Sequence, residues 1–274
     1  MKDLVSEKQK LFQRSVNIVS DIDNLEILNS FLPSITGNNT LLEFCANLTK
    51  GQGAFTWTGA YGSGKSTLAV ILLSLLRQKK SQIYKTAINT VSDDVLVAID
   101  TCFAKFSNRT LIPLVGPKGN LDQILRAKLK DAFPDADLHG NLVDVFEKIT
   151  KAQQIFLVID ELGKYLEDAA RSNNDIFILQ ELAELASRSG GNFILLGILH
   201  QSFSEYTQNF DKQVRDEWQK IQGRFLDIPI NITLGEQISL ISAALDESET
   251  NWSQNDPYLF ISNVIDEIKG RERW

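Results

Sequence analysis

The sequence predicts an α/β fold in which a mostly parallel central β-sheet is covered by helices on both faces. Two continuous apolar runs, at 155–159 and 193–199, are typical of strands buried on both faces of a parallel sheet. Segments with helical periodicity lie between the strands, and this alternation is the pattern of an α/β fold. A glycine-rich turn joins a strand expected at 54–58 to an apolar helix expected at 65–78.

The remaining elements follow from hydrophobic periodicity and from glycine and proline signals. Apolar residues between positions 3 and 32 recur without one clean period, which favours helices broken by a turn. Pro113 lies within one expected strand, and proline suits an edge strand better than a central one. Further strands are expected at 110–115 and 226–230, and further helices at 39–48, 92–106, 121–133, 142–151, 176–188 and 235–245.

Composition limits the class of protein and its partners. With 274 residues, 43% of them hydrophobic, the chain can bury the core of one large domain, with or without appendages. A formal charge of −7 argues against a protein that coats nucleic acid over its whole surface. Any contact with DNA is therefore expected at a local basic patch or through a partner chain.

The two cysteines and the N-terminus indicate a compartment. Cys45 and Cys102 have no histidine or cysteine neighbours at metal-ligand spacing, so we expect buried thiols in a reducing environment. The first residues resemble neither a secretory signal nor a transit peptide. No apolar run approaches the roughly 20 residues of a spanning helix. These observations predict a soluble, cytoplasmic protein without a membrane segment.

The glycine-rich turn, Gly59-Ala-Tyr-Gly-Ser-Gly64-Lys65-Ser66-Thr67, satisfies the pattern G-x-x-x-x-G-K-[ST] between a strand and a helix. Its glycines allow backbone N–H groups and the following helix N-terminus to face a phosphate group. Lys65 is expected to reach the β- and γ-phosphates, and Ser66 to ligate Mg²⁺. The alternative is a surface glycine turn. The residues expected to bind ATP are Gly59, Ala60, Tyr61, Gly62, Ser63, Gly64, Lys65, Ser66 and Thr67.

Two carboxylates follow the apolar run at 155–159. Because ligands of open α/β sheets collect at the carboxyl ends of the strands, Asp160 is expected to hold Mg²⁺ together with Ser66. Glu161 directly follows it and is expected to orient and polarise an attacking water, which favours hydrolysis over binding alone. A solvated strand end with two acidic residues is the alternative.

Three residues further along the chain are candidates for contact with the transferred phosphate. His200 and Gln201 follow the run at 193–199 and are expected beside the Asp160 strand, where either could contact the γ-phosphate or the water. Arg224 precedes the last expected strand and is a candidate to stabilise phosphoryl charge, in the usual case on a neighbouring subunit. The alternatives are a structural histidine and a surface salt bridge of Arg224.

Other polar residues near the expected site have weaker signals. Lys164 and Tyr165 follow the two carboxylates closely enough to affect the site, or they begin a helix. Asn120, beyond the expected strand at 110–115, could position Glu161.

The order of these motifs resembles that of the additional-strand branch of P-loop ATPases, and within it the AAA+ and STAND-like groups. The segment 59–66 is similar to Walker A, 155–161 to Walker B, and 195–201 to the sensor 1 strand. Gly223-Arg224-Phe225 resembles the arginine-finger region of origin-recognition-type AAA+ proteins. The resemblance covers about residues 40 to 246.

This resemblance implies a three-layer P-loop NTPase sandwich with sheet order 5-1-4-3-2 and with ATP at an edge that a neighbouring subunit or domain completes. The interval from Lys65 to Asp160 is longer than a minimal AAA+ core needs, so extra helices are expected around the second strand. Little chain follows Leu245, which suggests a truncated lid and a longer protein. The expected parts are a helical N-terminal segment at 1–38, the ATPase core at 39–246 and the start of a lid at 247–274.

More narrowly, the phrases that begin at Thr58, Asp160 and Leu199 resemble those of large bacterial ATPases in anti-phage defence clusters. The resemblance implies an ATP-driven switch or motor that acts as a homo-oligomer or with a nuclease or other effector. A STAND-like slow nucleotide switch is the main alternative. A kinase is disfavoured by Glu161 and by the lack of a short arginine-rich lid, and a GTPase by the lack of an Asn-Lys-x-Asp motif.

Overall fold

The computed structural model describes residues 15–31, 33–105, 108–116, 119–172, 177–206 and 212–244. The chain divides into two compact units, one formed by residues 16–231 and the other by residues 1–15 and 232–274. In the second unit, helix α13 (Leu234–Ala244) begins with a capping box, in which Thr233 and Glu236 each accept a hydrogen bond from the other's backbone N–H. The lid expected at 247–274 lies outside the described residues.

The larger unit is built on a five-stranded sheet in the order β2-β3-β4-β1-β5, and every strand pair in it is parallel. Read from the other edge, this is the order 5-1-4-3-2, so the expected fold class is confirmed. Neighbouring parallel strands require helical crossovers, which explains the alternation of strand and helix along the chain. The strands are β1 (Ala54–Thr58), β2 (Arg109–Val115), β3 (Gln154–Asp160), β4 (Phe193–Leu199) and β5 (Leu226–Pro229).

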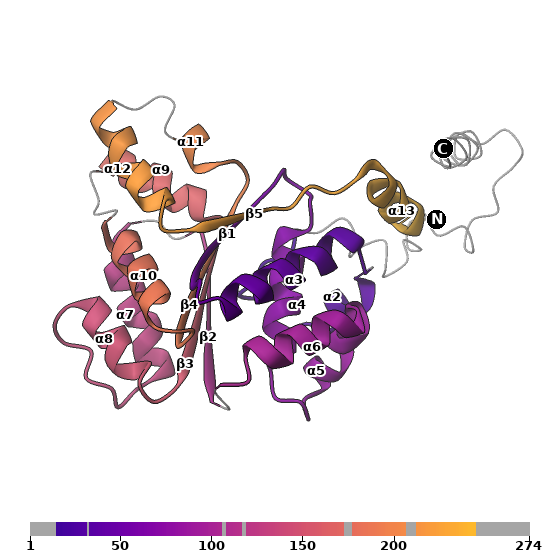
Figure 1. The fold of residues 1–274 in the computed structure, drawn as a ribbon, viewed down its shortest axis with the longest axis horizontal. Helices are drawn as coiled ribbons and strands as arrows, with labels where there is room; N and C mark the ends of the chain where they lie inside the picture. The colour runs from indigo at the N-terminus through magenta and orange to yellow at the C-terminus, as the bar shows by residue number, and fades with distance from the viewer. Residues whose placement is uncertain are drawn as a thin grey trace, which may run out of the picture. The chain divides into compact units, whose positions relative to one another are not determined.

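Helices cover both faces of the sheet and form the outer two of three layers (Figure 1). One face carries α2 (Leu25–Ser30), α3 (Ile35–Thr49), α4 (Lys65–Leu75), α5 (Gln82–Ala87), a 3₁₀ turn (Ile88–Thr90) and α6 (Asp93–Cys102). The other face carries α7 (Leu121–Ala132), α8 (Leu142–Ile149), α9 (Leu162–Ser172), α10 (Phe177–Arg188) and α12 (Lys212–Gln222), with α11 (Phe203–Tyr206) close to α9 and α12.

The sheet separates two apolar layers. Every residue of β3 and β4 is buried, as the two continuous apolar runs predicted. On the α3 face, the Phe44 ring lies 4.5 Å from the Phe55 ring and 6.0 Å from the Phe156 ring, measured between centroids. On the opposite face, Phe146 of α8 lies 5.0 Å from Phe193 of β4. Burying one such side chain contributes about 1.5–3 kcal/mol, so these contacts hold the helices to the sheet.

Several elements differ from the expectation for local physical reasons. Helix α3 begins at Ile35, within the segment expected to be separate, because the Ser34 side chain accepts the backbone N–H of Gly37 and caps the helix. Pro113 is accommodated because β2 is an edge strand. Helices α5, α11 and α12 were not predicted, whereas α9 agrees with the alternative in which Lys164 and Tyr165 begin a helix. Helix α12 is mostly polar and buries Trp218 and Ile221.

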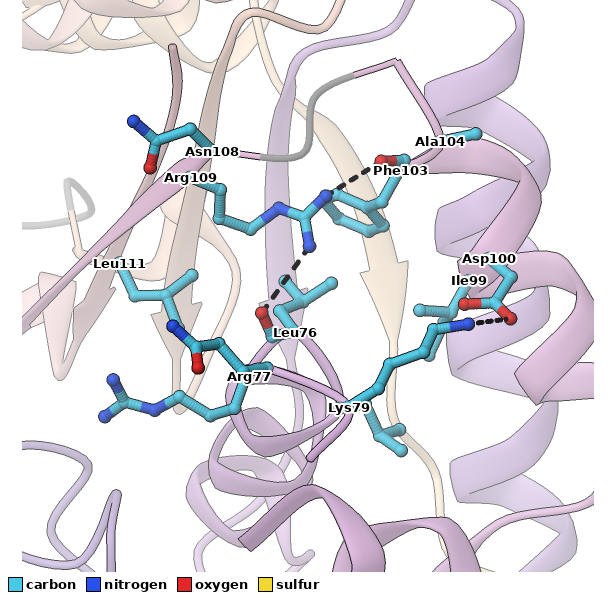
Figure 2. A pocket seen from close by; sticks show the side chains of 12 residues that line it. Leu76, Arg77, Lys79, Ile99, Asp100, Phe103, Ala104, Asn108, Arg109 and Leu111 are labelled. Atoms are coloured by element: carbon cyan, nitrogen blue, oxygen red, sulfur yellow. Dashed lines mark hydrogen bonds and ion pairs between the residues drawn. The ribbon is translucent and has the colours of Figure 1, made fainter. Parts of the chain in front are cut away.

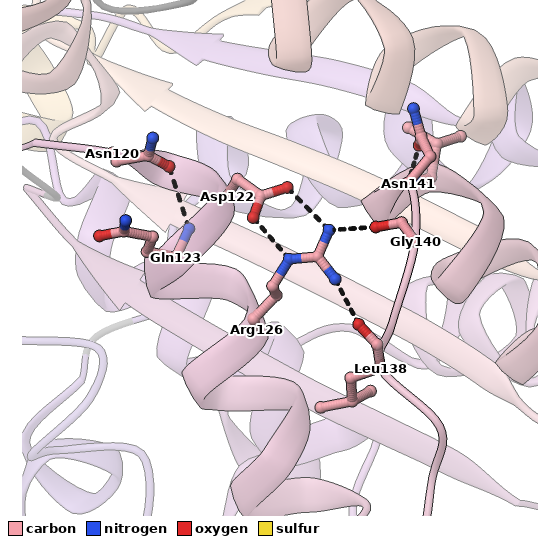
Figure 3. A network of polar contacts seen from close by, with 8 residues as sticks. Asn120, Asp122, Gln123, Arg126, Leu138, Gly140 and Asn141 are labelled. Atoms are coloured by element: carbon pink, nitrogen blue, oxygen red, sulfur yellow. Dashed lines mark hydrogen bonds and ion pairs between the residues drawn. The ribbon is translucent and has the colours of Figure 1, made fainter.

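The connection between α7 and α8 is held by one arginine (Figure 3). Arg126 pairs with Asp122 one turn earlier at 2.5 Å and donates to the backbone carbonyls of Leu138 and Gly140. Asn120 caps α7, because its side-chain oxygen accepts the backbone N–H of Gln123 at 3.1 Å. This cap, rather than a contact with Glu161, is the role that the structure gives to Asn120.

No helix in the described part of the chain is long and apolar enough to cross a membrane.

Candidate functional site

The candidate site lies at the carboxyl edge of the parallel sheet. The glycine-rich loop follows β1, Asp160 ends β3, and His200 follows β4, which lies between those two strands. Because all strands run in the same direction, their carboxyl ends meet at this edge, where ligands of open α/β folds bind. Segments far apart in sequence therefore contribute to one site.

The loop has the backbone that a phosphate cradle requires. Gly62 and Gly64 have φ angles of 80° and 76°, in the left-handed region that glycine enters without steric cost. Gly59 is needed for another reason: a Cβ atom there would lie 2.4 Å from the carbonyl oxygen of Ile230, which follows β5. Helix α4 begins directly after Gly64, so its N-terminus is the end nearest the loop.

Lys65 is buried and points back into the loop. Its ammonium donates to the backbone carbonyls of Gly59 at 2.6 Å and Ala60 at 2.7 Å, and to the Ser63 hydroxyl at 3.2 Å. Burial lowers the pKa of Lys65, and the nearby Asp160 carboxylate partly opposes this shift. A cation held among loop carbonyls can exchange these oxygens for those of a phosphate.

Asp160 is 2% exposed and ends β3. Its carboxylate accepts a hydrogen bond from the backbone N–H of Glu161 at 2.8 Å. Burial raises the pKa of Asp160, while the nearby Ser66 hydroxyl at the start of α4 and the Glu161 N–H act in the opposite direction. The structure thus brings together the two residues that the sequence analysis assigned to Mg²⁺.

A hydroxyl and a carboxylate fit the oxygen preference of Mg²⁺, which takes few protein ligands and keeps water or phosphate oxygens for the rest. Among the described residues, no group of three or more histidine, cysteine, aspartate or glutamate side chains could hold a metal ion. That Ser66 and Asp160 ligate Mg²⁺ stays a prediction.

Glu161 stands in an uncommon backbone conformation. Its φ of 52° is in the left-handed region, and it is the one non-glycine residue with positive φ in the described ranges. Its Oε2 atom accepts a hydrogen bond from the Lys164 ammonium at 2.5 Å. This contact raises the pKa of Lys164. The expected water-orienting carboxylate is therefore held in an ion pair.

His200 reaches the same neighbourhood as the loop. Its imidazole stacks on the ring of Tyr61, with centroids 3.6 Å apart and planes inclined by 20°. Both ring nitrogens are buried without a hydrogen-bond partner among the residues described. Burial lowers the pKa of His200, with further lowering from the charges of Lys65 and Lys164, while Glu161 acts in the other direction.

Tyr206 fixes the end of β4. Its hydroxyl accepts the backbone N–H of His200 at 3.3 Å. Its ring lies so close to Gly163 that a Cβ atom at 163 would approach it to 2.3 Å. Gln201 is half-buried beside the site, and a contact between its side chain and phosphate stays a prediction.

Arg224 does not lie near the glycine-rich loop of its own chain. It precedes β5 at the strand's amino end, and its guanidinium pairs with Glu184 of α10 at 2.7 Å. Because the loop follows β1 at the carboxyl end, the two lie at opposite ends of the parallel strands. An action of Arg224 on a neighbouring subunit stays a prediction.

A cavity of about 590 Å³ lies away from this site, between the C-terminal ends of α4 and α6 and the start of β2 (Figure 2). Arg109 donates within it to the carbonyls of Leu76 at 3.5 Å and Phe103 at 2.8 Å, and to the Gln154 side chain at 2.8 Å. Burial lowers the pKa of Arg109. These bonds satisfy carbonyls at the ends of two helices, which gives Arg109 a structural role.

Two contacts of the site were not predicted from sequence. The pairing of Lys164 with Glu161 follows from their three-residue spacing at the start of α9, the helix that was the alternative interpretation of Lys164 and Tyr165. Tyr61 of the glycine-rich loop stacks on His200 after β4, and no pattern in the sequence indicates that these two segments are in contact.

No protein-family model matches this sequence, and no curated protein matches it. Solved structures similar to the chain include the three that follow. The Aeropyrum pernix ORC2 protein in its ADPNP–ADP complexes has 17% sequence identity and a TM-score of 0.46, with 79% of this chain and 53% of that chain covered. This chain thus spans about half the length of that protein.

The other two structures are less similar. Drosophila ORC bound to GC-rich DNA and Cdc6 has 12% identity and a TM-score of 0.34, over 85% of this chain and 73% of that chain. C. elegans PCH-2 has 12% identity and a TM-score of 0.37, over 90% and 62%. Sequence identities and TM-scores this low do not support a function for this chain. The fold assignment rests on the order of the strands in the sheet.

Proposed function

We propose that this chain binds ATP with Mg²⁺ at residues 59–67 and hydrolyses it. The proposal is supported above all by the meeting of the glycine-rich loop with the Asp160 carboxylate, which is 2% exposed and ends a strand two positions away in the sheet. The Ser66 hydroxyl and the Lys65 ammonium of the loop both lie close enough to act on this carboxylate. A surface glycine turn would have no reason to lie against a buried aspartate. In an ATP site of this kind, a loop hydroxyl and such an aspartate hold Mg²⁺.

Each loop residue has a role in the proposed binding. Backbone N–H groups between Gly59 and Thr67 would donate to phosphate oxygens, and the N-terminus of α4 would add its positive dipole end. Lys65 would exchange its bonds to the Gly59 and Ala60 carbonyls for bonds to the β- and γ-phosphates. Mg²⁺, held by Ser66 and Asp160, would neutralise phosphate charge.

The residues beyond the loop would act on the attacking water and on the γ-phosphate. Glu161 would accept the hydrogen bond of the water and then its proton. His200 offers two ring nitrogens that have no partner in the described chain, and either could bond a phosphate oxygen. Gln201 is the second candidate for this contact. Arg224 would stabilise phosphoryl charge at the site of a neighbouring subunit.

The proposed biological role is that of an ATP-driven switch or motor subunit in bacterial anti-phage defence or DNA processing. It would act in a homo-oligomer or with an effector such as a nuclease, in the cytoplasm. DNA contact would be local or through a partner, as the charge of −7 requires. In this proposal, 1–38 is a helical N-terminal segment, 39–246 is the ATPase core and 247–274 begins a lid, with α3 crossing the boundary between the first two parts.

A slow, STAND-like nucleotide switch is the second candidate. It is favoured by the ion pair of Glu161 with Lys164, since a carboxylate in such a pair is less available to a water molecule. A very low basal rate that rises sharply with a trigger ligand would support it.

The first experiment measures ATP hydrolysis with and without duplex DNA, together with size-exclusion chromatography in ATP. Lys65→Ala and Glu161→Gln should both abolish turnover, and Glu161→Gln should still bind ATP. Stimulation by DNA would favour the motor, and a larger species in ATP would support the oligomer. Failure of the unaltered chain to bind ATP would refute the proposal.

A further inference from the structure

We propose that Lys164 is a positioning residue that holds the Glu161 carboxylate away from the phosphate loop and so keeps basal ATP hydrolysis slow. The inference rests on the proposed function, because it concerns the carboxylate that would orient the attacking water. It assigns to Lys164 a role that acts through Glu161 and not through contact with the nucleotide.

The position of the carboxylate carries the argument. The Oε2 atom of Glu161, which accepts from Lys164 at 2.5 Å, lies 3.0 Å from where a Cβ atom of Gly116 would stand. Gly116 directly follows β2, and β2 is the edge strand on the far side of β3 from β4 and β1. The ion pair therefore draws the carboxylate toward β2, whereas the phosphate loop follows β1.

The glycine at 116 leaves the space that this arrangement needs. A Cβ atom there would also lie 3.2 Å from Cδ of Lys164, so a larger residue would press on both members of the pair. Gly116 has a φ of 46° and donates its N–H to the backbone carbonyl of Asp160 at 2.8 Å. Its backbone is thus fixed to the strand end that carries Glu161.

Stability does not explain the ion pair. The side chains of Lys164 and Glu161 are 49% and 26% exposed, and ion pairs at such positions add little to folding. Lys164 also lies in the first turn of α9, where the helix dipole disfavours a cation. A lysine at this place is better explained by its effect on Glu161.

The chemical consequence is a carboxylate in a displaced position. A carboxylate oxygen that accepts a hydrogen bond from an ammonium is less available to accept one from an attacking water molecule. Removal of the ammonium would free the side chain to turn toward β4 and β1. Lys164 would therefore slow ATP hydrolysis and leave nucleotide binding unchanged.

The test compares the steady-state kinetics of Lys164→Met and Lys164→Arg with those of the unaltered chain. We expect Lys164→Met to raise kcat at least about threefold, with KM and ATP affinity unchanged, because only the catalytic base is affected. Lys164→Arg keeps the cation and should keep the low kcat. Lys148→Met, an exposed lysine of α8, is the matched control and should not change kcat.

The double variant Lys164→Met with Glu161→Gln should lose turnover, because the gain acts through Glu161. A gain that persists in this double variant would overturn the inference, as would an unchanged or lower kcat in Lys164→Met. In those cases the proposed function would still stand if Glu161→Gln alone abolishes hydrolysis. Absence of ATP hydrolysis in both the unaltered chain and Lys164→Met, despite ATP binding, would overturn the proposed hydrolysis and the inference with it.

Discussion

The ring of Tyr61 in the phosphate loop lies on the imidazole of His200 at the end of β4, with 3.6 Å between the ring centroids. Tyr61 is itself 76% exposed, so it shields His200 while facing solvent. Both nitrogens of the imidazole are buried and lack a hydrogen-bond partner in the described ranges. The stacked rings join the loop to the end of β4, so a movement of either segment would alter this contact.

Removing this ring should change the protonation of His200. Because burial is the largest cause of the lowered pKa of His200, Tyr61→Ala should raise that pKa toward its ordinary value near 6.5. NMR titration of the imidazole signals measures the shift. His139, the other histidine of the chain, is the internal reference, and its signals should be the same in both proteins. A His200 titration identical in both proteins would show that Tyr61 does not desolvate the ring.

The same lowered pKa predicts a dependence of stability on pH. Between the pKa of His200 in the folded chain and its higher unfolded value, the unfolded chain binds more protons, so the free energy of unfolding increases with pH. His200 therefore opposes folding below about pH 6.5 and has no such effect at pH 8. Urea unfolding at pH 8 and pH 5.5 should show a smaller loss of stability in His200→Gln than in the unaltered chain. An equal loss in both would contradict the prediction.

Gly59 should be required for the close approach of the loop to the end of β5. In Gly59→Ala the new methyl group would meet the Ile230 carbonyl oxygen at 2.4 Å, so the backbone must move. We expect a loss of about 1–3 kcal/mol in the free energy of unfolding, together with weaker ATP binding. The matched control is Gly223→Ala, whose nearest new contact is an ordinary 3.4 Å. Urea denaturation and nucleotide titration of the two variants test this, and equal stability of both would refute it.

Arg126 should hold the connection between α7 and α8. Arg126→Met removes the ion pair with Asp122 and the donors to the Leu138 and Gly140 carbonyls. Because these bonds involve a charged group, we expect a loss of about 1–3 kcal/mol and faster proteolysis at residues 133–141. Lys130→Met, at an exposed position of α7, serves as the control. If the two variants are cut at the same rate, Arg126 does not order this connection.

Strands were the most predictable part of the fold. The expected strands at 54–58 and 193–199 coincide with β1 and β4, because a strand buried on both faces is a continuous apolar run bounded by turn residues. Helices with a broad apolar face, such as α7, were also placed well. Helix α12 was missed because its packing against α10 and α11, and not its own periodicity, buries Trp218.

The sequence by itself determined the phosphate loop, the two carboxylates after β3 and the order in which they occur. These features are local, since a glycine pattern and a buried strand that ends in acid need only a few adjacent residues to be recognised. The strand order was also anticipated, because the order of the motifs along the chain resembles that of a known branch of ATPases.

Only the tertiary structure decided which side chains meet. It brought Ser66 near Asp160, paired Glu161 with Lys164, and placed Tyr61 on His200. It also paired Arg224 with Glu184, at the end of the sheet opposite the loop. Such contacts depend on the alignment of strands distant in sequence and on side-chain rotamers selected by packing, and neither leaves a periodic signal in the sequence.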